Sequence, residues 1–156
     1  MTDQLSYDYI VVGAGSAGAV IASRLTESGR HSVLLLEAGP EDKNPWIHVP
    51  LGYGKLFTNA TVNWLYSTEP NNEQVNRRIP QPRGKVVGGS SAINGMVYIR
   101  GHRSDYDQWR QMGNTGWGWE DVLPVFRESE DFAGGESQLH GVGGEWRVRE
   151  EPGPHA

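Results

Sequence analysis

The sequence predicts an α/β fold that begins with a strand, a helix and a second strand. Three observations support this prediction. A short β-branched run ends at a glycine, an amphipathic helical pattern follows it, and a second apolar run comes after a brief connection. Because the connections are short, we expect the two strands to be parallel neighbours joined by a right-handed crossover.

The first strand is expected at residues 9–12, where Tyr-Ile-Val-Val leads into Gly13. Apolar residues at three- and four-residue spacing predict a helix from Ser16 to Ser28, and Gly29 is placed to end it. The segment 32–37 (SVLLLE) predicts the second strand. Both runs are continuously apolar, so we expect both strands to be buried.

The rest of the chain is expected to be rich in loops. It contains all 9 prolines, and the chain as a whole has 21 glycines and only 37% hydrophobic residues. Local patterns predict a short helix, a short strand, two longer helices and a final strand, at 51–57, 64–68, 104–112, 120–131 and 145–149.

Composition excludes several classes of protein. The formal net charge is −5 and the basic residues are scattered, which argues against a nucleic-acid partner. The chain has no cysteine, so disulfides and cysteine-based metal sites are excluded, and we expect no metal. No apolar run reaches the roughly 20 residues of a membrane span, and no secretory signal pattern is present. We therefore expect a soluble, cytoplasmic protein.

The first glycine loop, residues 13–18 (GAGSAG), has the Gly-x-Gly-x-x-Gly spacing of a Rossmann-like dinucleotide site, and Glu37 ends the second strand. Gly13 permits a tight turn, Gly15 lets a pyrophosphate approach the backbone, and Gly18 lets the helix pack against the strand. Glu37 is suited to accept hydrogen bonds from ribose hydroxyls. These features do not separate NAD from FAD, so an NAD-dependent dehydrogenase stays an alternative.

A second glycine loop lies in mid-chain at residues 84–97 (GKVVGGSSAINGMV). It is not a phosphate-binding loop of the NTPase type, because Val86 and not Ser or Thr follows Lys85. The loop offers backbone N–H groups and two hydroxyls. It can start a helix with Ser90 or Ser91 as the cap, or it can lie flat against a ligand, because glycines allow close approach of the backbone. Apolar residues surround it, so we predict that it packs against a planar or phosphorylated ligand.

Both loops fit one known pattern. The residues that carry it are 7–18, 36–39 and 84–107, with smaller matches at 63–64, 116–117 and 140–141. Over nearly the whole chain, to about Val148, the sequence resembles the N-terminal part of the glucose-methanol-choline (GMC) flavoprotein oxidoreductases, especially choline dehydrogenase-like alcohol dehydrogenases. The resemblance implies an FAD cofactor and the oxidation of a small alcohol by hydride transfer to the flavin. It leaves the particular alcohol, the electron acceptor and the oligomeric state open.

The resemblance also implies how the cofactor is divided. The first loop holds the ADP half, and the second lies beside the pyrophosphate and the flavin, where the Asn94 amide steadies the electron-rich reduced ring. Some relatives attach FAD through a histidine at the position of Ile93, so FAD is expected here to be noncovalent. The expected cofactor contacts are Gly13, Gly15, Ser16, Ala17, Gly18, Glu37, Ala38, Trp64, Val86, Gly89, Ser90, Asn94, Gly95, Met96 and Val97.

The catalytic base is not expected in this chain. In the family, a histidine with a histidine or asparagine partner lies near the C-terminus of much longer chains. A parallel sheet also needs more strands than this sequence predicts. We therefore expect a fragment, with a partial FAD-binding domain at 1–145 and the start of a further segment at 146–156. The alternative is a cofactor-binding fragment without catalytic activity. The histidines match no catalytic position and are expected at the surface or in loops: His31, His48, His102, His140 and His155.

Overall fold

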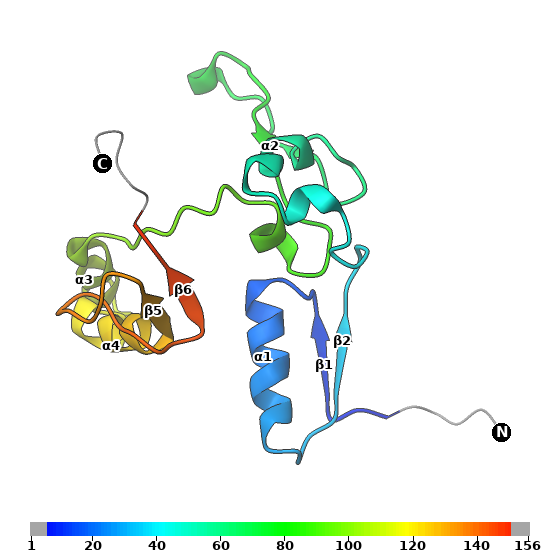
Figure 1. Cartoon of the computed structure of the whole chain (residues 1–156). Coiled ribbons are helices and arrows are strands. Elements are labelled where there is room, and N and C mark those ends of the chain that lie inside the picture. The colour runs from blue at the N-terminus through cyan, green and yellow to red at the C-terminus, as the bar shows by residue number, and fades with distance from the viewer. Residues whose placement is uncertain (1–5, 151–156) are drawn as a thin grey trace. The chain divides into compact units, whose positions relative to one another are not determined.

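A computed structural model describes residues 6–150 of the chain. The backbone divides into two compact units, with the boundary after Val97. The first unit carries both glycine loops, and the second contains the helices α3 and α4 (Figure 1). Within residues 6–150, no helix has the length and apolar character needed to cross a bilayer.

The first unit begins with the predicted strand, helix and strand. Strands β1 (Tyr9–Val12) and β2 (Val33–Leu36) pair in parallel over all four residues. Helix α1 (Ser16–Glu27) packs against both strands (Figure 1). Gly29 lies just beyond the helix with a φ of +65°, a conformation that glycine adopts readily, so its predicted role in ending the helix is confirmed.

The expected burial of the two strands is wrong. Ile10 and Val12 expose 63% and 82% of their surface. In the described residues the sheet has two strands and α1 packs on it from one side, so much of its apolar surface stays uncovered. The strands are also joined at their starts, where the Asp8 carboxylate accepts hydrogen bonds from the Ser32 N–H (2.7 Å) and hydroxyl (2.8 Å). These bonds hold the pKa of Asp8 below its usual range.

A small apolar core supports the second glycine loop. It consists of Leu56, Val62, Val86 and Ile93, and each side chain is almost completely buried. The predicted helix at 51–57 is present as a short 3₁₀ turn, η2 (Pro50–Gly52), followed by α2 (Tyr53–Leu56). Another 3₁₀ turn, η1 (Pro45–Ile47), precedes them. The core therefore joins the segment around α2 to both ends of the loop.

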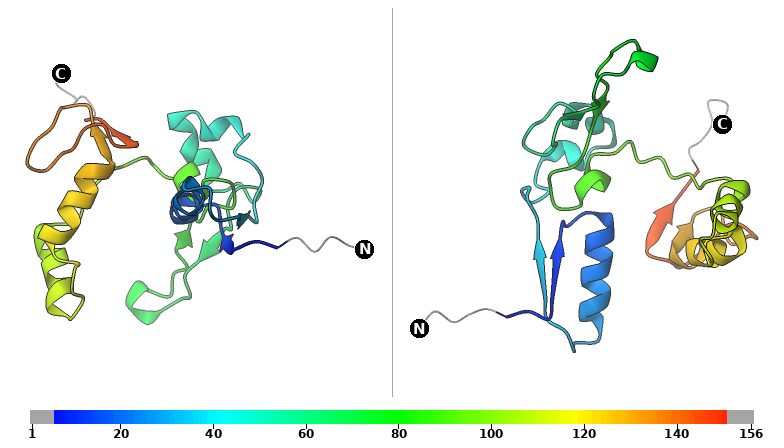
Figure 2. Two further views of the ribbon diagram at one scale, coloured as in Figure 1. Left: turned by 90° about the horizontal axis from the view of Figure 1, so that it is seen from below. Right: turned by 180° about the vertical axis from the view of Figure 1, so that it is seen from behind.

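A hairpin extends from the first unit. Strands β3 (Tyr66–Ser67) and β4 (Pro80–Gln81) pair antiparallel, and the turn η3 (Asn72–Gln74) lies between them (Figure 2). The strand predicted at 64–68 is thus present but shorter. At the tip, Val75 has a φ of +53° and exposes 81% of its surface, which is an unfavourable backbone conformation for a β-branched residue.

The second unit is organised by two helices, α3 (Arg103–Gln111) and α4 (Trp119–Ser129). The Tyr106 ring lies between them, with its centroid 5.4–5.8 Å from three other aromatic rings: Trp109, Trp119 and Phe126. Asp107 connects the helices, because its carboxylate accepts a hydrogen bond from the Trp119 N–H (3.1 Å).

The helix predicted at 120–131 ends earlier than expected. The chain turns into strand β5 (Glu130–Phe132), which pairs in parallel with β6 (Trp146–Val148), the strand predicted at 145–149. The reason is the burial of Glu130, which is 0% exposed. Its carboxylate accepts a hydrogen bond from the Gly141 N–H (2.9 Å), which a continued helix would not bring to it.

Two further groups surround the Glu130 carboxylate. Arg100 Nη2 lies 2.8 Å from Glu130 Oε2, as an ion pair without the geometry of a hydrogen bond, and His140 Nδ1 lies 3.1 Å from Oε1. Burial raises the pKa of Glu130, but the Gly141 N–H, His140 and Arg100 together outweigh it and hold the pKa below its usual range. His140 is half-buried in a loop. The other histidines within the described residues, His31, His48 and His102, are exposed, and His155 lies outside them.

Candidate cofactor-binding site

The two glycine loops lie against each other. The Gly88 N–H donates to the Ala14 carbonyl oxygen (2.8 Å), and Gly88 forms an isolated parallel bridge with Gly15. The Val87 N–H donates to the Pro40 carbonyl oxygen (3.0 Å) in the segment after β2. Three segments that are distant in the sequence therefore meet at the carboxyl ends of β1 and β2, the edge where α/β sheets bind ligands.

Three glycines at this junction leave no room for a side chain. A Cβ added to Gly89 would lie 2.7 Å from the Gly15 Cα atom, and Gly89 has a φ of +57°. A Cβ on Gly84 would lie 2.0 Å from the Gly89 carbonyl oxygen, and one on Gly39 would lie 2.0 Å from the Lys85 carbonyl oxygen. Neither Gly39 nor Gly84 had a predicted structural role, because the backbone that each of them approaches is not adjacent to it in the sequence.

The prediction that Ser90 or Ser91 caps a helix is wrong. Both lie inside the 3₁₀ turn η4 (Gly89–Ala92), and the capping position is taken by Gly88 without a side-chain hydrogen bond. The Ser90 hydroxyl oxygen accepts from the Gly84 N–H (3.1 Å), and the Ser91 hydroxyl donates to the Gly88 carbonyl oxygen (2.5 Å). Both serine hydroxyls therefore bond to backbone groups of the loop itself, the Gly84 N–H and the Gly88 carbonyl oxygen, and stabilise the loop.

A groove of about 500 Å³ opens where the three segments meet. It brings together many of the residues predicted to contact the ADP half and the pyrophosphate. Its lining residues are Val12, Gly13, Gly15, Leu36, Glu37, Ala38, Trp64, Gly84 and Gly89. Gly13 has a φ of +97°, which confirms the predicted tight turn.

Glu37 fastens the first loop to the end of β2. Its Oε2 atom accepts from the Ala14 N–H (2.8 Å), and its Oε1 atom accepts from the Gly39 N–H (2.9 Å). A carboxylate offers about four acceptor positions, so each oxygen keeps capacity for another donor. Glu37 lines the groove and is only partly buried, which leaves it accessible to a ligand hydroxyl.

Gly15 differs from the other glycines at this junction. Its φ is −80°, which any residue adopts. A Cβ added there would lie 3.7 Å from the Gly89 Cα atom, an ordinary van der Waals contact. The described fold therefore accepts a side chain at this position, but a Cβ would occupy space at the wall of the groove.

Trp64 forms another wall of the groove. Its ring stacks on Tyr66, with 5.9 Å between centroids and an interplanar angle of 7°. Lys85 Nζ lies 5.0 Å from the centroid of the Trp64 ring, within the range of a cation–π interaction. These two contacts hold the indole in place before any ligand arrives.

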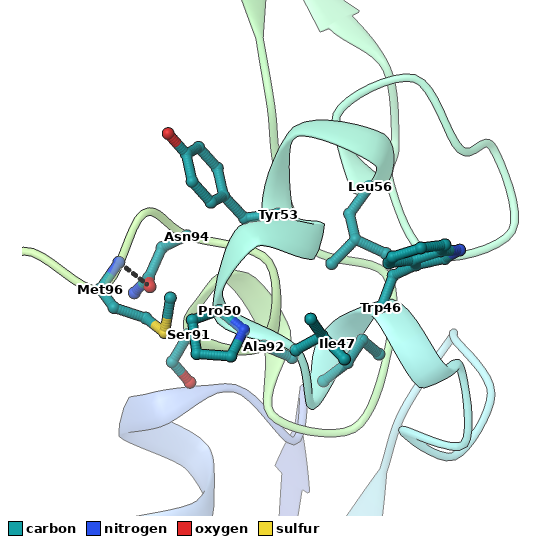
Figure 3. A pocket seen from close by; sticks show the side chains of 10 residues that line it. Trp46, Ile47, Pro50, Tyr53, Leu56, Ser91, Ala92, Asn94 and Met96 are labelled. Carbon is teal, nitrogen blue, oxygen red and sulfur yellow. Dashed lines mark hydrogen bonds between the residues drawn. The ribbon is translucent and has the colours of Figure 1, made fainter.

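A second, smaller cavity of about 100 Å³ contains residues predicted to contact the flavin (Figure 3). Asn94 and Met96 line it together with Ser91 and residues of the segment around α2, among them Trp46 and Tyr53. The Asn94 Oδ1 atom accepts a hydrogen bond from the Met96 N–H (2.8 Å), drawn as a dashed line in Figure 3.

Other predicted contacts lie outside both cavities. Val86 is 0% exposed and packs in the apolar core, so its side chain is not accessible to a ligand. Ser16 and Ala17 are exposed on the first turn of α1, and Val97 is exposed at the end of the first unit. A Cβ on Gly18 would lie 1.9 Å from the Gly13 carbonyl oxygen, which confirms its predicted packing role.

Comparison with known proteins places these features in a family. The sequence profile of the GMC oxidoreductases matches residues 7–155. An oxygen-dependent choline dehydrogenase from Rhizobium rhizogenes is 46% identical over 142 residues, which are 91% of this chain and 26% of that protein. The chain thus spans about a quarter of the length of this relative.

Solved structures of two oxidoreductases are also similar to this chain. The crystal structure of pyridoxine 4-oxidase from Mesorbium loti matches with a TM-score of 0.84 and 39% identity, over 91% of this chain and 28% of that one. An FAD-dependent oxidoreductase from Chaetomium thermophilum matches with a TM-score of 0.76 and 34% identity, over 92% and 26%. The chain belongs to the GMC oxidoreductase family and corresponds to the N-terminal region of its members.

Proposed function

We propose that this chain is the FAD-binding part of an alcohol oxidoreductase and that it holds FAD noncovalently along both glycine loops. The proposal rests on the position of Gly15. The described fold accepts a Cβ at this position, yet the residue is a glycine at the wall of the groove, beside the N-terminus of α1. A pyrophosphate that approaches the backbone explains why a side chain is absent.

The lining residues fit the two ends of FAD differently. At the ADP end, the first turn of α1 offers backbone N–H groups to phosphates, and Glu37 offers acceptor positions to a ribose. At the other end, Asn94 and Met96 line a largely apolar cavity with the aromatic residues Trp46 and Tyr53 in its wall; at about 100 Å³ it offers an apolar surface for one edge of a flat ring and not room for the whole of it. When bound, the flavin supplies the hydride acceptor, while the residues of this chain bind and orient it.

Two observations support noncovalent binding and a small alcohol substrate. Ile93 carries an alkyl side chain that packs in the apolar core, so it offers no atom for a bond to a flavin. The family includes proteins named for choline and pyridoxine, both of which are small alcohols.

The test is a titration of the chain with FAD, followed by amide chemical shifts, which also report weak binding. We expect Gly15→Ala to weaken FAD binding by about tenfold or more, since it removes close backbone contacts worth more than about 1.4 kcal/mol. Gly54→Ala is the matched control, because a Cβ there meets no atom within 4 Å. Equal FAD affinity in the two variants would refute the proposed position of the pyrophosphate.

A cofactor-binding module without catalysis is the second candidate for the chain alone. It is favoured by the lining of the two cavities, which includes no histidine that could take a proton from an alcohol. An assay for turnover of choline with an artificial electron acceptor distinguishes a catalytic chain from a cofactor-binding module. Turnover by the isolated chain at a rate typical of enzymes would rule out the module.

A further inference from the structure

Asn94 is the asparagine in this sequence that is followed directly by a glycine, Gly95. A backbone nitrogen can attack the side-chain amide carbon of a preceding asparagine, because the two groups are held close together by the chain itself. The attack is easiest when the residue that supplies the nitrogen has no Cβ, since a side chain crowds the five-membered ring that forms. The sequence therefore favours an intramolecular reaction at residues 94–95.

The surroundings leave this pair free to react. Asn94 and Gly95 are both exposed, so water and hydroxide can reach them. Within residues 6–150, the Gly95 N–H donates to no acceptor, and the Asn94 Nδ2 atom has no hydrogen-bond partner. The nitrogen that would attack and the nitrogen that would leave are thus not held by other groups.

The side-chain oxygen of Asn94, in contrast, is held. It accepts a hydrogen bond from the Met96 N–H at 2.8 Å, so that a short turn closes around Gly95 (Figure 3). When the Gly95 nitrogen attacks the Cγ atom, negative charge develops on this oxygen. A hydrogen bond to a charged oxygen is roughly twice as strong as one to a neutral oxygen, so the Met96 N–H stabilises the transition state more than the starting amide.

The other asparagines of the chain lack this combination, because each is followed by a residue with a side chain. After Asn44 comes Pro45, which has no N–H to attack. Three other N–H groups that follow an asparagine are engaged with backbone carbonyl oxygens at 2.9–3.1 Å, those of Trp64, Arg77 and Thr115.

Asn59 provides an internal comparison, because it has the same turn. Its Oδ1 atom accepts from the Thr61 N–H at 2.9 Å, and the residue between them is Ala60. The Ala60 N–H makes no hydrogen bond in the part of the chain that the structure describes. Two features distinguish this turn from the one at Asn94: the middle residue carries a Cβ, and the asparagine is half-buried.

We propose that residues 94–95 form a self-modification site, at which Asn94 is converted to aspartate or isoaspartate. The Gly95 N–H gives its proton to hydroxide, and its nitrogen forms a bond to Asn94 Cγ. The bond between Cγ and Nδ2 breaks, and this nitrogen takes a proton from water and leaves as ammonia. Water then opens the five-membered ring at either of its two carbonyl carbons. The sum is the hydrolysis of one amide, without oxidation or reduction.

The reaction changes the second glycine loop. Either product places a negative charge at the small cavity, which Asn94 lines. In isoaspartate the backbone also passes through the former side-chain carbon, so the turn between Asn94 and Met96 gains one atom and loses its geometry. The shape of this loop therefore has a limited chemical lifetime in solution.

The test is to incubate the whole chain in water labelled with heavy oxygen and to follow its tryptic peptides by mass spectrometry. Peptide 86–100 contains Asn94 and no other asparagine or glutamine, so incorporated label identifies the reacting residue. Asn94 should react at least roughly tenfold faster than Asn59, a factor that corresponds to about 1.4 kcal/mol in the barrier. Equal rates at the two asparagines, or no label in peptide 86–100, would refute the proposal.

Two variants test the role of the glycine. Gly95→Ala should slow the reaction of Asn94 by roughly tenfold, and the fold accepts it, because the added Cβ meets only the Tyr53 Cε2 atom, at 4.0 Å. Ala60→Gly is the matched control, since it gives Asn59 the same middle residue and should speed its reaction by a similar factor. Unchanged rates in both variants would show that the glycine is not the cause.

A comparison of the folded chain with the chain unfolded in urea tests the turn. Unfolding separates the Met96 N–H from the Asn94 oxygen, so Asn94 should react roughly fivefold more slowly in urea, as expected from the loss of one hydrogen bond. A faster reaction in urea would mean that the fold protects the pair, against the proposal. None of these measurements requires a cofactor, so their outcome is independent of the proposed binding of FAD.

Discussion

Replacement of the buried amide of Asn63 should destabilise the first unit strongly. The Asn63 side chain makes three hydrogen bonds of 2.9–3.1 Å, to Phe57, Leu65 and Arg83. In Asn63→Leu these backbone groups lose their partner, and at about 1 kcal/mol for each net hydrogen bond the loss is about 3 kcal/mol. Arg83 precedes Gly84, so the variant should also loosen the start of the second glycine loop.

The assay is a urea titration followed by the NMR signals of the core methyl groups of Val62 and Val86. Asn59→Leu serves as the control, because the same chemical change there removes a single hydrogen bond, to Thr61, and should cost about 1 kcal/mol. An equal decrease in the free energy of unfolding for Asn63→Leu and Asn59→Leu would contradict the structural role of the Asn63 amide.

Three further predictions concern stability and binding. Val75→Asn should raise the free energy of unfolding by about 1 kcal/mol in a urea titration, since asparagine tolerates the left-handed conformation better; a loss of stability would contradict this. The pKa of Glu130 is lowered in the folded state, so its stabilising effect is complete above the ordinary carboxyl pKa and is lost as pH falls through the lower folded pKa. Unfolding by acid, followed by tryptophan fluorescence, should show this loss. Glu130→Gln should abolish the pH dependence and cost about 3 kcal/mol near neutral pH, because the Arg100 side chain, only 11% exposed, loses its counter-charge. Gly89→Ala should lower both stability and FAD affinity, because a Cβ there would lie 2.7 Å from the Gly15 Cα atom; a melt unchanged from wild type would show that the loops do not pack this closely.

The local elements of the fold could be predicted from the sequence. The first strand, α1, its terminal glycine and the second strand follow from periodicity and from residues adjacent in the chain. Burial of the strands could not be predicted in this way, because it depends on which other elements cover the sheet. The early end of α4 likewise depends on Gly141, Arg100 and His140, which reach Glu130 from outside the helix.

The candidate site was predictable as two loops but not as one surface. The glycine spacing indicates a dinucleotide, yet nothing local shows that Gly88 bonds to Ala14 or that Gly89 rests on Gly15. The capping role expected for Ser90 failed for the same reason, since its hydroxyl meets the Gly84 N–H. An asparagine two residues before Met96 was a usable signal for the turn, because asparagine side chains often bond to the N–H two residues on.

We propose that the two glycine loops together hold one cofactor, with the ADP end on the first loop and the flavin end on the second. The most direct measurement maps amide shifts of the chain with ADP, with FMN and with FAD. We expect ADP to shift the amide signals of residues 13–18 and 37–39, FMN to shift those of residues 94–97, and FAD to shift both sets. Shifts confined to the first loop with FAD, or shifts of both loops with NAD that equal those with FAD, would contradict it.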